Sequence, residues 1–192
     1  MGNLRRAGGP VLIFAALVAV GGCVFRQTGP LAVAVRRIAV LPPCDTEGHP
    51  LPGAGSESEG LAEVLAGAAR AVLARNGFAV IDPVSVELAL KGRVPSSPAD
   101  AAALARAGAL ESAVLFIRLD RWVPNPESTM RIDSVLVALD VTLLDQSGAV
   151  LWHAHRPLQP VPIYGALFIG QGYVVAADAV MAEVLGPLRP AA

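Results

Sequence analysis

Two histidines separated by a single residue are the first candidates for chemistry in this sequence. His153 and His155 lie in a strand-like segment, so both side chains would project from the same face of a sheet. Imidazole nitrogens at that spacing can hold a metal ion, but a structural site needs further ligands. The chain offers only His49, Cys44 and carboxylates that are distant in sequence. We therefore interpret the pair as solvated or hydrogen-bonded, and we expect no metal ion and no cofactor.

Two further motifs contain the residue types of an active site without the required spacing. Ser56 and Ser58 lie in a glycine-rich stretch, but neither has a glycine two positions away on both sides, as a nucleophile elbow requires. Gly170 and Gly172 precede a predicted helix, yet Val175 occupies the place of the third glycine of a dinucleotide-binding turn. We interpret the first motif as a polar loop and the second as the approach to a helix.

The aspartates of the second half show no spacing typical of a catalytic pair. Asp120, Asp133 and Asp140 are scattered along the chain. General acid–base catalysis needs groups placed within reach of one substrate. We interpret these carboxylates as solvent-facing charges and expect that the protein is not an enzyme.

The N-terminus has the organisation of a secretory signal. Arg5 and Arg6 precede an apolar run at residues 10–20, which ends in Gly22 and Cys23. The run is too short to cross about 30 Å of hydrocarbon as a permanent helix. The alternative is an uncleaved anchor in which the cysteine is incidental.

The junction between Gly22 and Cys23 resembles the lipobox of bacterial lipoproteins. In that family the cysteine thiol receives a diacylglycerol, the signal peptide is removed before it, and the new N-terminus receives an acyl chain such as palmitate. The resemblance implies a signal peptide over 1–22, a lipidated N-terminus and tether over 23–35, and a single α/β periplasmic domain over 36–190.

The residue after the cysteine bears on localisation. Val24, rather than aspartate, follows Cys23. By resemblance to proteobacterial lipoproteins this implies sorting to the outer membrane, where lipid on Cys23 would hold the domain to the periplasmic face. Retention in the inner membrane is the alternative.

Composition excludes two broad classes of protein. Of 192 residues 54% are hydrophobic and 16% charged, with a mean hydropathy of +0.55, which excludes a disordered chain. The net charge of −1 gives no basic footprint for nucleic acid. Removing residues 1–22 leaves 170 residues with 13 basic against 16 acidic side chains, a net charge of −3. The apolar excess therefore divides between the signal and an Ala- and Val-rich core.

The rest of the chain alternates between strand-like and helix-like segments. Short apolar runs and period-two alternation predict strands at 37–41, 78–81, 113–119, 131–145 and 149–155. Helical spacing and capping residues predict helices at 61–73, 83–90, 97–107 and 174–185. The order β-α-β-α-α-β-β-β-α predicts an α/β domain with a mixed sheet, built from βαβ crossovers in its first half and a meander in its second.

The fourth predicted strand has the cleanest alternation. One face carries only apolar residues, and a turn at 145–148 leads to the next strand. These apolar residues are Val135, Val137, Leu139, Val141 and Leu143. Prolines at 157, 160 and 162 predict that the following strand breaks soon after residue 155.

Cys44 has no cysteine partner if Cys23 carries lipid. We interpret it as a small buried side chain at the end of a strand. A reactive thiol and an intermolecular link are the alternatives.

Four features of this chain occur together: the lipobox, the strand before Pro42 and Pro43, the helix that stops at Asn76 and Gly77, and the hairpin strand that contains Trp152. In combination they resemble a group of bacterial lipoproteins, most of all those of the GNA1162 type. The group shares a domain with the curli secretion lipoprotein, the penicillin-binding-protein activator lipoproteins and the N-terminal domain of the Tol-Pal translocation protein. The resemblance implies a three-layer α/β domain that acts by protein contact, and it supplies no catalytic residues.

Two apolar features lie in loop regions where a partner could bind. Trp122 stands at the end of a predicted strand, and a glycine-flanked segment over 163–169 precedes the last helix. The candidate contact residues in that segment are Tyr164, Leu167, Phe168 and Ile169. The alternative is that both features fold back onto the core.

Together these interpretations predict a lipid-anchored periplasmic adaptor or accessory protein in cell-envelope assembly or secretion. Its partners would be the membrane and an unknown envelope protein, with self-association as a further possibility and no nucleic acid. One alternative is an oligomeric component of an outer-membrane secretion pore, although the chain lacks the long amphipathic hairpins of a barrel. A small metal-dependent or hydrolytic enzyme is the second alternative.

Overall fold

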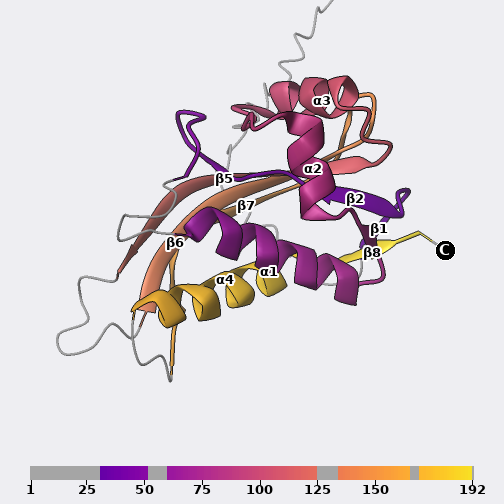
Figure 1. The fold of residues 1–192 in the computed structure, drawn as a ribbon. Coiled ribbons are helices and arrows are strands. Elements are labelled where there is room, and N and C mark those ends of the chain that lie inside the picture. The colour runs from indigo at the N-terminus through magenta and orange to yellow at the C-terminus, as the bar shows by residue number, and fades with distance from the viewer. Residues whose placement is uncertain (1–30, 52–59, 125–133, 165–168, 192) are drawn as a thin grey trace, which may run out of the picture.

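The computed structural model describes residues 31–51, 60–124, 134–164 and 169–191, whose strands form a main sheet with helices on both faces and a separate two-stranded sheet (Figure 1). The predicted order of strands and helices is confirmed from Arg37 to Leu185. The short strands β1, β3 and β8 were not predicted. The elements are β1 (Leu31–Val33), β2 (Arg37–Val40), β3 (Cys44–Asp45), α1 (Leu61–Arg75), β4 (Ala79–Val80), α2 (Pro83–Leu90), α3 (Pro98–Ala107), β5 (Ala113–Pro124), β6 (Ser134–Leu144), β7 (Val150–Pro162), α4 (Ile169–Leu185) and β8 (Leu188–Pro190).

The main sheet is mixed, as the sequence predicted. Its strands follow the order β4-β2-β5-β6-β7, and β3 also pairs with β5. β2 runs parallel to β4 and β5, whereas β5, β6 and β7 form an antiparallel meander. The parallel half needs helical crossovers, which α1 and the pair α2–α3 provide.

The helices form two layers around this sheet (Figure 1). α1 and α4 share one apolar cluster with the inward face of β6, on which all five alternating residues named above are fully buried. α2 and α3 share a second cluster with Phe116 and Leu144 on the opposite face. Burying such side chains contributes roughly 1.5–3 kcal/mol each, so the two clusters hold the three layers together.

Capping contacts confirm the predicted starts of α2 and α3 and the predicted stop after α1, whereas α4 begins at Ile169, five residues before the predicted start at 174. Asp82 accepts a hydrogen bond from the Ser85 amide at the start of α2. Ser97 caps α3 in the same way, through a 3.2 Å bond from the Asp100 amide. α1 ends at Arg75 and its C-cap is Asn76, whose Nδ2 donates to the Leu185 carbonyl at 2.9 Å and so joins the C-terminal ends of α1 and α4.

β7 extends past the predicted break and continues to Pro162. It is the last strand in the order, and prolines can stay in an edge strand where the missing N–H would face outward. Register shifts bend the pairing, and Arg156 supports the bend from a buried position. Its Nη1 donates to the Val137 carbonyl at 2.6 Å and to the Gln159 carbonyl at 3.3 Å. Side-chain hydrogen bonds therefore replace part of the ladder.

The predicted tether over 23–35 needs a correction at its C-terminal end. Leu31–Val33 forms β1 and pairs in parallel with β8, which buries Val33 and Leu188. The apolar side chains of this segment favour a strand over a solvated linker. The predicted signal peptide, Gly22 and Cys23 lie outside the described residues. Within the described residues, no helix has both the length and the hydropathy needed to cross a membrane.

Candidate functional site

Polar side chains from three strands gather on one face of the meander. Arg118 on β5 lies opposite Asp140 on β6, which in turn lies opposite His155 on β7. His153 pairs with the neighbouring Thr142, so both histidines flank Asp140. This confirms that the two histidines project from one face, which is the face that carries α2 and α3.

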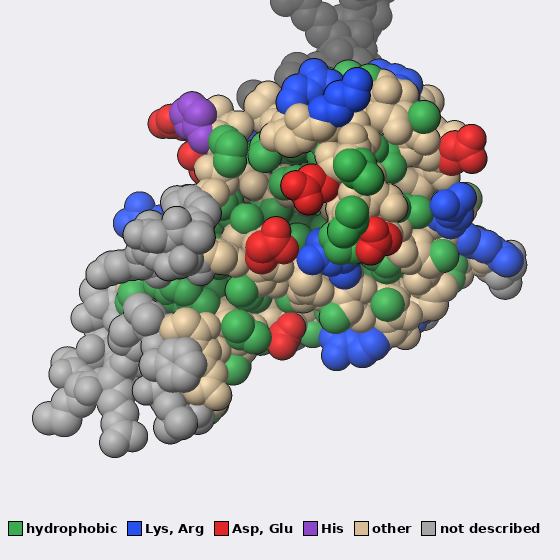
Figure 2. Space-filling view, viewed as in Figure 1, with side chains coloured by type: hydrophobic (Ala, Val, Ile, Leu, Met, Phe, Trp, Pro, Cys, Tyr) green, Lys and Arg blue, Asp and Glu red, His purple; other side chains and the backbone are tan. Residues whose placement is uncertain are grey.

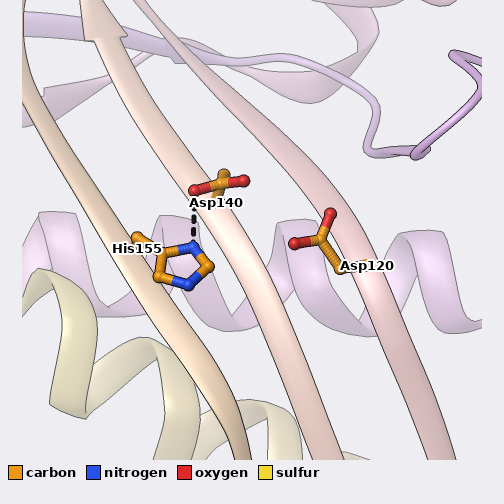
Figure 3. Close-up of side chains that lie close together, drawn as sticks. All are labelled: Asp120, Asp140 and His155. Carbon is orange, nitrogen blue, oxygen red and sulfur yellow. Dashed lines mark hydrogen bonds and ion pairs between the residues drawn. The ribbon is translucent and has the colours of Figure 1, made fainter. Parts of the chain in front are cut away.

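Asp140 is at the centre of the cluster, between His155 and Asp120 in Figure 3, and both of its carboxylate oxygens have partners. Oδ2 accepts a hydrogen bond from Arg118 Nη2 at 2.5 Å. Oδ1 lies 3.0 Å from Nδ1 of His155 and 3.3 Å from Nε2 of His153. Asp120 completes the group, because its Oδ1 lies 3.4 Å from Arg118 Nε.

Asp120 reaches the cluster through an irregularity in β5. The register shifts between Leu119 and Arg121, so Asp120 is an extra residue in the pairing with β6. Such a bulge re-aims the side chain of the extra residue. Asp120, Asp140 and His155 each contribute one ligand-type atom to a set in which all atoms lie within 4.8 Å of one another (Figure 3).

The surroundings alter the ionisation of both members of the central ion pair. Burial alone would raise the pKa of Asp140, but hydrogen bonds from His155 and Arg118, with the charge of Arg118, lower that pKa below its ordinary value. The hydrogen bond to Asp140 raises the pKa of Arg118. The pair is therefore charged throughout the neutral range.

The interpretation of Asp120 and Asp140 as scattered, solvent-facing charges is wrong. The two carboxylates converge because β5 and β6 pair in register, and the side chain of Asp140 is only 14% exposed. Asp133 lies outside the described residues. No local sequence pattern predicted that the two carboxylates lie close together, because their proximity depends on the register between β5 and β6.

The cluster is open to solvent on the side of β7. The side chains of His153 and His155 are 50% and 55% exposed. Beside them is a shallow depression of about 390 Å³, lined also by Pro98, Phe116 and Val150. The arrangement can bind a cation or exchange protons with solvent.

A second hollow lies where β2 ends between α1 and α2. Its apolar lining includes Val40, Pro42 and Val86, and Glu63 and Arg70 stand at its side 3.9 Å apart. Figure 2 shows acidic and basic side chains around hydrophobic ones on this face. Ligands of open α/β sheets bind at such carboxyl ends of strands, and Glu87 and Arg93 also line this hollow.

Cys44 is fully buried in β3, as the sequence predicted. Burial, with the nearby Asp45 carboxylate, raises the pKa of its thiol to about 11.

Gly170 and Gly172 lie inside α4 rather than in a turn before it, so they form no dinucleotide-binding loop. Ser56 and Ser58 lie outside the described residues.

The predicted contact segment is only partly described. Tyr164 is 82% exposed, whereas its neighbour Ile163 is buried. Leu167 and Phe168 lie outside the described residues, and Ile169 is the first residue of α4.

Trp122 takes an intermediate position between surface and core. Its ring packs edge to face against Tyr173, with 5.8 Å between the ring centroids and 84° between the planes. It lies against the cluster formed with α1 and α4 while remaining partly exposed.

Sequence reasoning missed several exposed apolar side chains. Val84 and Leu88 lie one turn apart on α2 and are 59% and 72% exposed. Leu158 on β7 and Val174 on α4 are also exposed. The outward face of α2 could not be read from its pattern, because its two polar side chains, Ser85 and Glu87, are two positions apart and form no polar stripe.

Comparisons with known proteins show the fold. No protein-family model matches the chain, and no curated protein gives a significant match. Among solved structures, a point variant of the PelC dodecamer from Paraburkholderia phytofirmans is 20% identical, with a TM-score of 0.53 over 86% of this chain and 96% of that chain. A second PelC dodecamer structure is 18% identical, with a TM-score of 0.49 over 86% and 96%. Lipoprotein GNA1162 from Neisseria meningitidis is also found, as the sequence resemblance predicted, at 18% identity and a TM-score of 0.45 over 75% and 94%.

Proposed function

We propose that this chain is a lipid-anchored accessory protein of the bacterial cell envelope, which acts as an adaptor in envelope assembly or secretion. Lipid on Cys23 would hold the α/β domain to the periplasmic face of the outer membrane. The domain would act by protein contact, and the proposed role needs no catalysis.

The observation that carries the proposal is the likeness in fold to PelC, a protein crystallised as a dodecamer. The likeness extends over 86% of this chain and 96% of that one, so it involves the whole folded domain. A domain that works by association needs a stable scaffold with exposed contact residues, and this fold provides one.

The N-terminal sequence supports the anchoring part of the proposal. A basic start, a short apolar run and Gly22–Cys23 have the order of a lipoprotein signal. Several acyl chains on one residue bind a bilayer far more firmly than a single chain does. Confinement to the membrane would raise the effective concentration of the domain near an envelope partner.

Exposed apolar side chains on β7, on α4 and between them support the contact part. Tyr164 lies two residues after the end of β7 and is 82% exposed, and Leu158 on β7 and Val174 on α4 are 52% and 46% exposed. Tyrosine supplies a large contact area at low entropic cost, and it is enriched where interfaces form. We propose the region around Tyr164 as the partner surface.

Membrane fractionation of Cys23→Ala tests the anchor. The wild-type protein is expected in the membrane fraction, and Cys23→Ala is expected uncleaved or in the soluble periplasmic fraction. Cys44→Ala is the matched control, since that cysteine is buried in the domain. Normal membrane fractionation of Cys23→Ala, with normal processing, would contradict the anchoring proposal.

Site-specific cross-linking in cells tests the contact surface. A photoreactive residue at position 164 is expected to give a discrete adduct with a partner or a second copy. Position 88 on α2 is the matched control, because Leu88 is comparably exposed on another layer. Adducts at position 88 with none at 164 would place the partner elsewhere.

The dodecameric state of PelC favours a second candidate, an oligomeric component of an outer-membrane secretion pore. This candidate predicts ring-shaped assemblies of the lipidated protein in detergent, visible by negative-stain microscopy. Monomers at high protein concentration would count against it and leave the adaptor.

A further inference from the structure

We propose that Asp120, Asp140 and His155 form a surface binding site for a divalent transition-metal ion of the zinc class. The sequence pattern predicted no metal ion, because the histidine pair had no visible third ligand. The strand register supplies that ligand, and the inference is independent of the proposed envelope role.

The donor atoms already lie at distances close to those of a metal site. One atom from each residue belongs to a set in which all atoms lie within 4.8 Å of one another (Figure 3). Zinc bound at about 2.0–2.2 Å by nitrogen and oxygen places neighbouring ligands roughly 3.3 Å apart in a tetrahedron. Asp140 Oδ1 and His155 Nδ1 lie 3.0 Å apart, so a small outward movement of the exposed imidazole would admit the ion.

Arg118 leaves the required oxygen of Asp140 available. Its Nη2 occupies Oδ2 at 2.5 Å, while Oδ1 faces the histidines. Metal-ligating carboxylates are commonly held in this way by a hydrogen bond to the second oxygen. Arg118 would therefore orient the ligand from outside the coordination sphere.

Asp120 provides a separate indication of a missing partner. Its Oδ1 is covered from solvent and accepts no hydrogen bond from the part of the chain that the structure describes. Its partner in the ion pair is Arg118 Nε, at a distance of 3.4 Å. That nitrogen donates no hydrogen bond to a described residue. The covered Oδ1 therefore has one cationic neighbour but accepts no hydrogen bond from a described residue, and an ion in the cluster would add a direct contact to this oxygen.

The charges of the cluster also favour a cation. With neutral imidazoles, two carboxylates and one guanidinium leave one uncompensated negative charge. Nδ1 of His155 offers its lone pair when its proton resides on Nε2, and that tautomer change needs no change in charge. His155 is 55% exposed, so water or a partner side chain could fill the remaining coordination positions.

His153 stands beside this set rather than within it. Its Nε2 lies 3.3 Å from Asp140 Oδ1, but it is not among the atoms that converge with Asp120 and His155. We therefore expect His155 to be the required imidazole and His153 to be dispensable.

Isothermal titration of the mature chain in detergent with Zn²⁺ alone, in chelator-free buffer at pH 7.5, tests the site. We expect one Zn²⁺ per chain, and we expect His155→Ala and Asp120→Asn each to weaken binding by about tenfold or more. His153→Ala should change the affinity by less than about threefold, as a residue outside the ligand set. Circular dichroism of each variant shows whether it is folded, and the exposed position of His155 keeps its variant informative.

His49→Ala is the matched control, since His49 is exposed and has Glu47 and Asp45 at 3.4 and 3.6 Å without a converging third strand. Absence of Zn²⁺ binding by the wild-type chain would overturn the proposal. Binding that survives His155→Ala, or that is lost in His49→Ala, would also overturn it.

Discussion

Arg118 and Asp140 form a hydrogen-bonded ion pair across β5 and β6, with 2.5 Å between Nη2 and Oδ2. The side chain of Asp140 is 14% exposed and that of Arg118 is 41% exposed, so solvent weakens the pair without removing it. We expect Asp140→Ala to lower the free energy of unfolding at pH 7 by about 1 kcal/mol, measured by urea denaturation. Asp178→Ala, which removes an exposed carboxylate from α4, is the control, and equal effects of the two substitutions would contradict this prediction.

The same pair predicts a defined pH dependence. Because the pKa of Asp140 is lowered in the folded state, its stabilising effect is complete above the ordinary value of 3.8 and is lost as the pH falls through the lowered value. The difference in unfolding free energy between the wild-type protein and Asp140→Ala should therefore shrink below pH 3.8. Urea titrations at a series of pH values measure it, and a difference that grows on acidification would reverse the assigned sign.

The contact between Asn76 and Leu185 predicts that α1 and α4 are coupled at their C-terminal ends. Asn76→Ala removes the 2.9 Å hydrogen bond to the Leu185 carbonyl, which is partly buried. We expect a loss of about 1 kcal/mol in the free energy of unfolding, with faster amide exchange at both helix ends. Arg75→Ala, at the exposed neighbouring position, should have a much smaller effect. Faster exchange in α1 alone would show that the two ends are not coupled.

Cys44 predicts the thiol chemistry of the mature protein. Its side chain is fully buried and the pKa of its thiol is raised to about 11, so a thiol reagent at pH 8 should not label the folded domain. After denaturation we expect one reactive thiol per chain, because a lipidated Cys23 is a thioether. A thiol titration with and without denaturant measures both values, and two thiols in the denatured chain would contradict lipidation.

The fold could be predicted from the sequence because its signals are local. The alternation in β6, the caps at Asp82 and Ser97 and the stop after Asn76 each follow from neighbouring residues, and each is observed. The length of β7 could not be predicted in this way. Its prolines are tolerated at a sheet edge, and the position of a strand in the sheet is set by tertiary pairing.

The candidate site shows the corresponding limit for function. The spacing of His153 and His155 was enough to place both on one face, but nothing in the sequence linked them to Asp140 or Asp120. Those contacts depend on the register of three strands and on a bulge after Leu119. Long-range register is invisible to local patterns, so sequence reasoning treated the carboxylates as isolated.

We propose above all that lipid on Cys23 anchors a folded α/β domain to the envelope. The most direct test is the intact mass of the protein purified in detergent from the membranes of a Gram-negative host. We predict a chain that begins at Cys23, with residues 1–22 absent and the added mass of a diacylglycerol and an acyl chain located on that residue by fragmentation. A chain that retains residues 1–22, or one that carries an unmodified Cys23, would contradict the account.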